Sequence, residues 1–227
     1  MLKSILIPGA LLLLSLFAAA QPVRGDQNCT FTIARLHYSG GGDWYCDPSS
    51  LPNLADAVRA RTEIPVCDTI TNVRINEERF FSFPFIYISG HGNIRFSQKE
   101  RLRLRQYLSR GGFIWADDNY GLDEPLRREL KKLFPENSLT EIRSNHPLFS
   151  SEYRLKGVPK IHEHDGDPAR AYGIYFNDRL VFLYTHSADI GDGMEDTEVH
   201  KDGKDLHETA LKMGVNIISW FFNPEES

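Results

Sequence analysis

Four segments of this sequence place polar side chains and glycines directly after an apolar stretch. They are residues 37–44, 89–92, 117–121 and 186–191. If each apolar stretch is a strand of one parallel sheet, its polar end lies at the carboxyl edge, where open α/β sheets bind their ligands. A sheet with a purely structural role would not need polar groups at four such ends. We therefore expect one polar crevice that all four segments form together.

The side chains of this crevice suit acid–base chemistry or metal binding. His91 lies between two glycines, which permit close approach of a ligand, although a histidine that only bonds a neighbouring loop fits equally well. Asp117 and Asp118 point to opposite sides of their strand, so at most one of them faces the crevice. The candidate catalytic residues are His91 and Asp118. Candidate ligands of a zinc-like ion are His91, Asp118, His146 and Asp189, without a spaced metal motif and with structural hydrogen-bond networks as the alternative.

The glycine triplet at residues 40–42 predicts a tight turn more than an anion site. It lacks the spacing of a dinucleotide fingerprint and the lysine of a phosphate loop. Asp43 and Trp44 follow it and could bind a polar ligand and stack on a sugar or base, or close over the core. The predicted ligand-binding set is His37, Gly41, Gly42, Asp43, Trp44, His91, Asp117, Asp118 and Asp189.

Two other polar clusters are expected to be loops, a solvated loop at residues 162–165 and a mobile acidic loop at 189–198. Residues 162–165 read His-Glu-His-Asp in a poorly patterned region, and the acidic run at 189–198 departs from the calcium-loop pattern. No nucleophile elbow of the G-x-S-x-G or G-x-C-x-G type occurs. Cys46 comes closest to such a nucleophile, without an elbow around it.

Apolar strands alternate with amphipathic helices along the chain. Ser97 and Glu100 form a capping-box pattern, Asp123 is expected to cap the next helix, and Asn177-Asp178 predicts a hairpin turn. Such alternation predicts an α/β fold: a flavodoxin-like three-layer sandwich with a mostly parallel sheet and an antiparallel hairpin near the C-terminal end. The predicted strands are 31–37, 64–70, 83–89, 113–116, 172–176 and 179–184, and the predicted helices are 49–58, 97–110, 123–134 and 206–221.

The N-terminus and the charge limit the compartment and the partners. Lys3, an apolar run at 5–17 and three alanines at 18–20 predict a signal peptide over residues 1–20 and export to a periplasm or medium, with an uncleaved membrane anchor as the alternative. One domain is expected over 28–224, with no integral membrane span after cleavage. The chain has 227 residues, a net charge of −5 and a pI near 5.9, which argues against nucleic acid as a partner. Of three cysteines, Cys46 and Cys67 are the weakly preferred disulfide pair, and three free thiols are the alternative.

Four ordered motifs resemble a known family. They are HYSGGGDWY at 37–45, PFIYISGHG at 84–92, LSRGGFIWADD at 108–118 and GVNII at 214–218. They resemble a bacterial domain-of-unknown-function family that is similar to class I glutamine amidotransferase-like domains. This resemblance implies the flavodoxin-like fold, export or membrane tethering, and association with von Willebrand-type and ATPase proteins. Amidotransferases use a cysteine nucleophile with His and Glu, and the missing cysteine elbow argues against glutaminase chemistry.

Two functions remain open on this basis. The first is a module that binds a ligand or partner in the crevice, such as an envelope polymer or a partner protein. The second is a hydrolase in which a metal ion or Asp118 activates a water molecule while His91 polarises the substrate. The sequence identifies no cofactor for either function.

Overall fold

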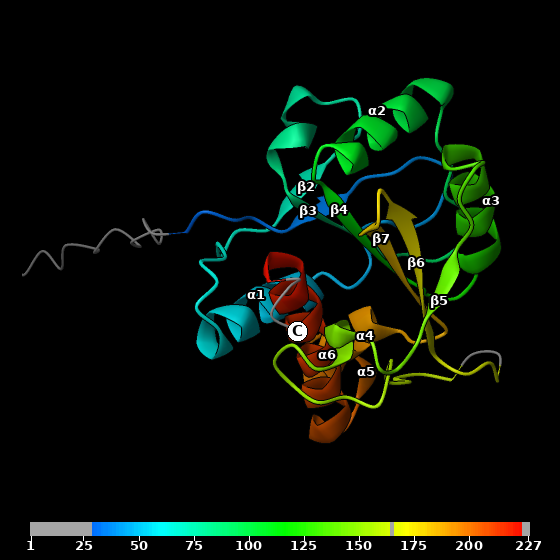
Figure 1. Cartoon of the computed structure of the whole chain (residues 1–227). Coiled ribbons are helices and arrows are strands. Elements are labelled where there is room, and N and C mark those ends of the chain that lie inside the picture. The colour runs from blue at the N-terminus through cyan, green and yellow to red at the C-terminus, as the bar shows by residue number, and fades with distance from the viewer. Residues whose placement is uncertain (1–28, 164–165, 224–227) are drawn as a thin grey trace, which may run out of the picture.

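The strands form one seven-stranded sheet, as the computed structural model shows for residues 29–163 and 166–223 (Figure 1). The strand order is β2-β1-β3-β4-β7-β6-β5. The first five strands in this order are mutually parallel, and β6 pairs antiparallel with both β7 and β5. The strands are β1 (Ala34–Leu36), β2 (Thr71–Val73), β3 (Phe85–Ile88), β4 (Phe113–Asp117), β5 (Thr140–Ile142), β6 (Arg170–Phe176) and β7 (Arg179–His186).

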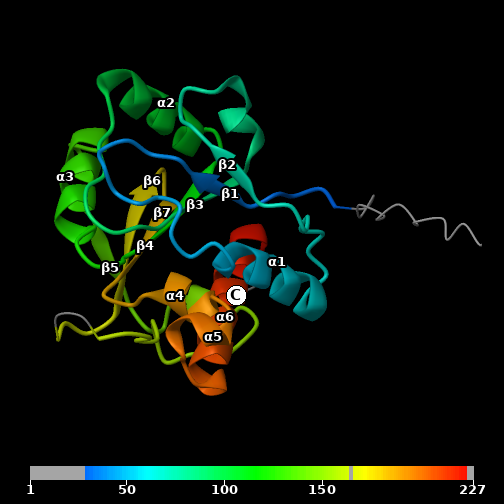
Figure 2. The same cartoon turned by 180° about the vertical axis from the view of Figure 1, so that it is seen from behind.

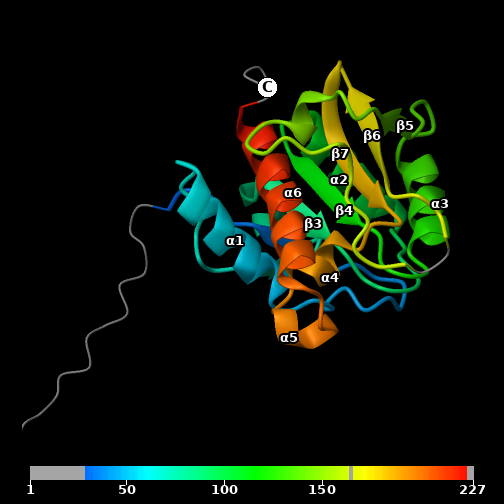
Figure 3. The ribbon, with the colours of Figure 1, turned by 90° about the horizontal axis from the view of Figure 1, so that it is seen from below.

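Helices cover both faces of this sheet, which confirms the predicted three-layer α/β fold. Figures 1 and 2 show α2 and α3 on one side and α1, α4 and α6 on the other, and Figure 3 shows α6 running along the sheet beside α1. Each face has its own apolar core. The helices are α1 (Ser50–Arg61), α2 (Gln98–Ser109), α3 (Asp123–Leu133), α4 (Ile190–Met194), α5 (Thr197–His200) and α6 (Lys204–Phe222), with short 3-10 turns η1 (Glu78–Ser82) and η2 (Pro147–Phe149).

Local sequence signals explain where several elements begin and end. The Ser97 side chain accepts from the Glu100 N–H while the Glu100 carboxylate accepts from the Ser97 N–H, so the predicted capping box begins α2. Strand β4 is buried along its whole length, as expected for a central strand with helices on both faces. Asn177 and Asp178 both have positive φ, the conformation of the tight turn that joins β6 to β7.

Two of the predicted element positions are wrong. The second strand lies at Thr71–Val73 and not at 64–70, because that apolar stretch forms only an isolated bridge, between Val66 and Phe31. Its apolar residues pack under the sheet edge instead of pairing in the ladder. Helix α3 begins at Asp123 with Leu122 as its cap residue, so Asp123 lies in the first turn and its carboxylate accepts from Arg127 and Tyr184 instead.

The disulfide joins Cys29 to Cys67, so the preferred pairing of Cys46 with Cys67 is wrong. The bridge between Phe31 and Val66 sets Cys29 beside Cys67, and the Cys67 N–H donates to the Phe31 carbonyl at 2.7 Å. Cys46, in contrast, follows β1 and lies near Ser89 after β3. It is therefore at the carboxyl edge of the sheet, whereas Cys67 precedes β2.

The predicted signal peptide at 1–20 lies outside the described residues. Within the part of the chain that the structure describes, no helix combines the length and apolar character that crossing a bilayer requires.

Candidate functional site

The strand order creates a divergence between the loops that follow β1 and β3. The chain leaves β1 for β2 on one side, and β3 lies on the other side of β1. Helices α1 and α2, which follow these two strands, pack on opposite faces of the sheet. A divergence of this kind at the carboxyl ends is where open α/β sheets bind ligands.

Glycines let the two diverging loops approach each other closely. A Cβ atom on Gly42 would lie 2.7 Å from the His91 carbonyl oxygen, and one on Gly90 would lie 2.2 Å from the Tyr38 hydroxyl. The Gly42 N–H donates to the Asn93 carbonyl at 2.9 Å, which closes the contact. Gly41 has a positive φ and open space around it. The glycine triplet thus forms a tight turn that fixes the loop bearing Asp43.

Asp43 and His91 meet at this divergence. His91 Nδ1 lies 3.1 Å from Asp43 Oδ2, and the His91 N–H donates to Asp43 Oδ1. Cys46 offers a sulfur close to both side chains. Its thiol donates to Asp47 at 3.1 Å, and burial raises the pKa of the Cys46 thiol above its ordinary value. The sulfur is therefore held as a neutral thiol and not as the thiolate that a cysteine nucleophile needs.

Asp117 and Asp118 point to opposite sides of β4, as the sequence predicts. Asp117 is fully buried and accepts from the Thr185 hydroxyl and, at 2.7 Å, from the Gly191 N–H. Burial raises the pKa of Asp117 well above its ordinary value. Asp118 accepts from the Ser187 N–H at 3.1 Å through Oδ2. Asp117 consequently secures the start of α4, whereas Asp118 faces the other side.

Asp118 lines a cavity of about 380 Å³ beside the ends of β4 and β7. Only 8% of Asp118 is exposed, and its Oδ1 has no hydrogen-bond partner in the structure. His186 is also buried, and its Nδ1 likewise has no partner there. His186 Nε2 lies 3.7 Å from Asp118 Oδ2 and 3.6 Å from Asp123 Oδ1. The cavity is lined by Asp118, Asn119, Tyr120, Gly121, Asp123, Glu124, Pro125 and Ser187.

A second group of acidic side chains surrounds α4. Asp189 is fully buried in a left-handed conformation at the start of this helix, and Asp192 is 6% exposed. Glu195 accepts from the N–H and the hydroxyl of Ser49, at the N-terminus of α1. The predicted mobile acidic loop is therefore wrong for this stretch, because residues 190–194 form a fully buried helix.

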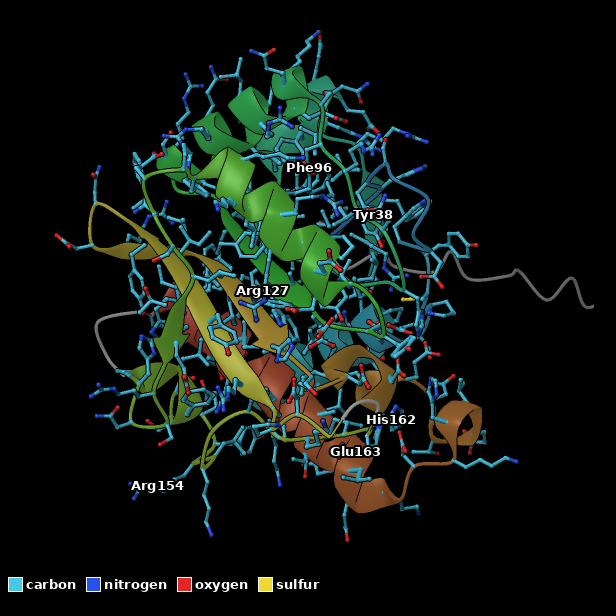
Figure 4. All side chains as sticks on the ribbon, turned by 90° about the vertical axis from the view of Figure 1, so that its right-hand side faces the viewer. Tyr38, Phe96, Arg127, Arg154, His162 and Glu163 are labelled. Atoms are coloured by element: carbon cyan, nitrogen blue, oxygen red, sulfur yellow. A yellow bond between two sulfur atoms is a disulfide. The ribbon has the colours of Figure 1, made fainter. Side chains whose placement is uncertain are left out.

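His162 lies between carboxylates of this second group. Its Nδ1 is 3.1 Å from Asp192 Oδ2 and 4.0 Å from Asp189 Oδ2, and its Nε2 is 3.0 Å from both oxygens of Asp202. Figure 4 labels His162 close to α4, at the end of the sheet that carries the site. His200 Nδ1 lies 3.9 Å from the same Asp192 oxygen. The expected solvated loop at 162–165 thus contributes a partly buried side chain at its first position.

Mutual repulsion and burial shift the acidity of these carboxyl groups. Burial, and next the charge of Asp192, raise the pKa of Asp47 to about 8. Burial and the same Asp192 charge raise the pKa of Asp189 to about 7, although His162 opposes the rise. Each pKa rises because a carboxylate in a low-dielectric site beside another negative charge is costly to ionise. The group therefore favours a proton or another cation.

Not all predicted site residues are brought together. His91 contacts Asp43, and no hydrogen bond or ion pair between described residues joins it to Asp118. His37 stacks on Trp44 with ring centroids 3.8 Å apart, so the two residues pair with each other. His146 caps η2 and packs against Trp220, which contacts Phe113 at the start of β4. His146 therefore lies toward the opposite end of the sheet from the other candidates.

Several residues of the site were missed because their signals are weak in the sequence. Asn119 donates from Nδ2 to Asp192 Oδ1 at 2.8 Å and so connects the cavity to the α4 group. His162 and Asp202 come from irregular segments, and His200 ends the four-residue helix α5, so a periodicity argument does not fix where these side chains lie. His186, in contrast, stands at a predicted strand end. Like His91, it follows a predicted strand, so its place in the sequence could have identified it as a candidate.

Comparison with known proteins places the chain in one family. A search of curated proteins gave no match. A family model matches residues 32–222, which include β1 to β7 and α1 to α6, and its description is "Domain of unknown function (DUF4159)". The relation to class I glutamine amidotransferase-like domains stays a prediction. The chain belongs to the DUF4159 family of domains of unknown function.

Proposed function

We propose that this protein is a ligand-binding module whose cavity beside Asp118 receives a neutral, hydroxyl-rich ligand such as a segment of an envelope glycan. The observation that carries this proposal is the cavity-lining side chain of Asp118, whose buried Oδ1 has no hydrogen-bond partner. His186, next in the chain to the lining residue Ser187, likewise has a buried Nδ1 without a partner. Leaving such atoms unpaired costs about 1–3 kcal/mol each. A ligand in the cavity that supplies a partner for Asp118 Oδ1 recovers this free energy on binding.

The residues that line the cavity define the chemistry of the ligand. They include three carboxylic side chains, those of Asp118, Asp123 and Glu124, and no basic side chain. An anionic ligand would therefore be repelled. Tyr120 at the rim is 65% exposed and offers an aromatic face. Carboxylate acceptors beside an aromatic face suit a sugar ring, because hydroxyls donate to the carboxylates while the ring's C–H face packs on the aromatic ring.

Titration calorimetry of the purified protein with chitotetraose and with cellotetraose tests this proposal. We expect saturable binding of at least one of these neutral oligosaccharides. Asp118→Asn should weaken it roughly tenfold to hundredfold, because a hydrogen bond to a charged group contributes about 1.5–3 kcal/mol. Asp68→Asn, which removes an exposed carboxylate that precedes β2, is the matched control and should bind like the unmodified protein.

Three results would contradict the proposal. One is the absence of heat with both oligosaccharides, and another is equal binding by the protein and its Asp118→Asn variant. The third is saturable binding of spermidine in place of the oligosaccharides, because the cavity would then select a cation.

Non-covalent hydrolysis is the second candidate function. Asp118 favours it, because burial raises the pKa of this carboxyl group and His186 lies 3.7 Å away, as in an acid–base pair. Mass spectrometry of the same oligosaccharides after incubation separates the two functions. Shortened products that disappear with Asp118→Asn would favour the hydrolase, whereas intact oligosaccharides that still bind would favour the module.

We also propose that the protein acts after export, with residues 1–20 removed. The disulfide between Cys29 and Cys67 supports this proposal, since structural disulfides persist mainly in oxidising compartments. An N-terminal sequence of the secreted or periplasmic protein that begins at Gln21 is the expected result. A protein that retains Met1 in the membrane fraction would favour the anchor.

A further inference from the structure

We propose that His162, His200, Asp192 and Asp189 form a binding site for one divalent transition-metal ion of the zinc class. This site is separate from the cavity beside Asp118, and the metal proposal does not depend on the glycan proposal. It draws its side chains from three segments: the irregular chain before β6, the turn and helix after β7, and helix α5.

Two imidazole nitrogens are directed at one carboxylate oxygen. His162 Nδ1 lies 3.1 Å and His200 Nδ1 lies 3.9 Å from Asp192 Oδ2, and the two rings are 5.2 Å apart. In a tetrahedral zinc site with bonds of about 2.0–2.1 Å, neighbouring ligand atoms lie roughly 3.3 Å apart. Small side-chain movements would therefore bring these three atoms into a zinc coordination sphere. Asp189 Oδ2, at 4.0 Å from His162 Nδ1, would supply the fourth ligand.

The other nitrogen of His162 has the partner that a metal-binding histidine usually has. Both oxygens of Asp202 lie 3.0 Å from Nε2, a geometry that suits an Nε2–H group that donates to the carboxylate. In the neutral ring, Nδ1 then presents its lone pair to Asp192. A lone pair that faces a carboxylate oxygen needs a cation between the two, and a metal ion can replace the proton that otherwise stands there. A carboxylate on the far nitrogen is also the outer partner that orients histidines in zinc sites.

The carboxylates around α4 need positive charge. Asp189 and Asp192 are both buried, and Asp47 and Glu195 are buried beside them. Asn119 donates to Asp192 Oδ1, which directs Oδ2 toward the two histidines. A divalent ion at this place would neutralise two carboxylates at once, and mixed imidazole and carboxylate donors favour zinc over magnesium or calcium. Figure 4 shows His162 labelled beside α4, with Glu163 next to it in the chain.

Metal titration of the chelator-treated protein, prepared without a histidine tag, tests this site. We expect one Zn²⁺ per chain by calorimetry, with micromolar or tighter affinity, and one Co²⁺ with the visible absorption of a four-coordinate ion. His162→Ala should weaken Zn²⁺ binding at least a hundredfold. Asp202→Asn should weaken it roughly tenfold to hundredfold through loss of the outer hydrogen bond.

Two further histidine variants locate the metal. His146→Ala, toward the opposite end of the sheet, should bind Zn²⁺ like the unmodified protein, and so should His186→Ala beside the cavity. If His162→Ala fails to fold by circular dichroism, His200→Ala carries the test, because that side chain is 31% exposed and its loss should weaken Zn²⁺ binding at least tenfold. The proposal is overturned by the absence of stoichiometric Zn²⁺, by unchanged affinity in the folded variants of His162 and His200, or by a loss confined to His186→Ala.

Discussion

Replacing Glu129 by Gln should destabilise the protein by about 2 kcal/mol at pH 7. Glu129 is fully buried on α3, and its Oε2 accepts from the Phe96 N–H at 3.2 Å. Its Oε1 accepts from Lys132 Nζ at 2.8 Å. The bond to Phe96 fixes the segment that follows Gly92, so the same carboxylate supports the loop that carries His91.

The magnitude follows from these contacts. A hydrogen bond to a charged group contributes about 1.5–3 kcal/mol and one between neutral groups about 0.5–1.5, so the buried bond to Phe96 loses roughly 1–1.5 kcal/mol when the charge is removed. Lys132 and Arg128 are 47% and 41% exposed, so together with Arg101 they add only about 0.5–1 kcal/mol because water screens exposed pairs. Glutamine keeps the shape of the side chain and leaves no cavity.

The effect should depend on pH with a defined sign. Burial alone would raise the pKa of Glu129, but the hydrogen bonds from Lys132 and Phe96 and the nearby positive charges lower it below its ordinary value. A carboxyl group whose pKa is lowered by folding contributes stability above its unfolded pKa, about 4.3, and loses that contribution as the pH falls through the folded pKa. The difference between the protein and its variant should therefore shrink on acidification.

Urea unfolding at pH 7 and at pH 3 measures this difference. Glu63→Gln, which neutralises an exposed carboxylate, is the matched control and should change the free energy of unfolding by less than about 0.5 kcal/mol. The reasoning is refuted if Glu129→Gln costs as little as the control at pH 7. It is refuted equally if the cost is the same at both pH values.

Two further predictions concern the frame of the site. Replacing both Cys29 and Cys67 by Ser should lower the free energy of unfolding by up to about 4 kcal/mol, since the bond spans 38 residues of chain. A thiol assay of the unfolded, unreduced protein should find Cys46 alone, and three thiols would contradict the pairing. Gly191→Ala should cost roughly 1–3 kcal/mol by overpacking, because its Cβ would lie 2.6 Å from the Tyr87 hydroxyl and 2.8 Å from Asp47 Oδ2. Gly203→Ala, with open space around it, is the control, and equal costs measured by urea unfolding would refute the clash.

Most of the fold could be predicted because its elements carry local signals. The capping box at Ser97, the Asn177-Asp178 turn and the apolar run of β3 each depend on neighbouring residues. The error at 64–70 arose because burial and strand pairing give the same apolar pattern. Val66 is fully buried although it pairs only in an isolated bridge. No local signal separates these two cases.

Only part of the candidate site could be predicted, for a similar reason. Asp43, His91 and Asp118 follow predicted strands, and a parallel sheet fixes the end at which such residues lie. His162 and Asp202 lie in irregular segments, and their contact spans 40 residues of chain. Their meeting depends on how α4 and α6 pack on the sheet. Hydrophobic periodicity predicts that helices pack on the sheet, but it does not predict which side-chain atoms come into contact.

The buried carboxylates of this protein differ in how many of their oxygens accept hydrogen bonds from other parts of the fold. Both oxygens of Asp117 accept hydrogen bonds from the β7–α4 segment. The two oxygens of Glu129 accept from the Phe96 N–H, just before α2, and from Lys132 on α3. These two groups are explained by the stability of the fold. Asp118 leaves Oδ1 without a partner, and Asp192 directs Oδ2 at two imidazole nitrogens. Since burying a carboxylate is costly unless its oxygens are paired, Asp118 is expected to bind a ligand through Oδ1. Asp192 already accepts from Asn119 and contacts His162, so it is expected to share its Oδ2 with a metal ion that the two imidazoles also hold.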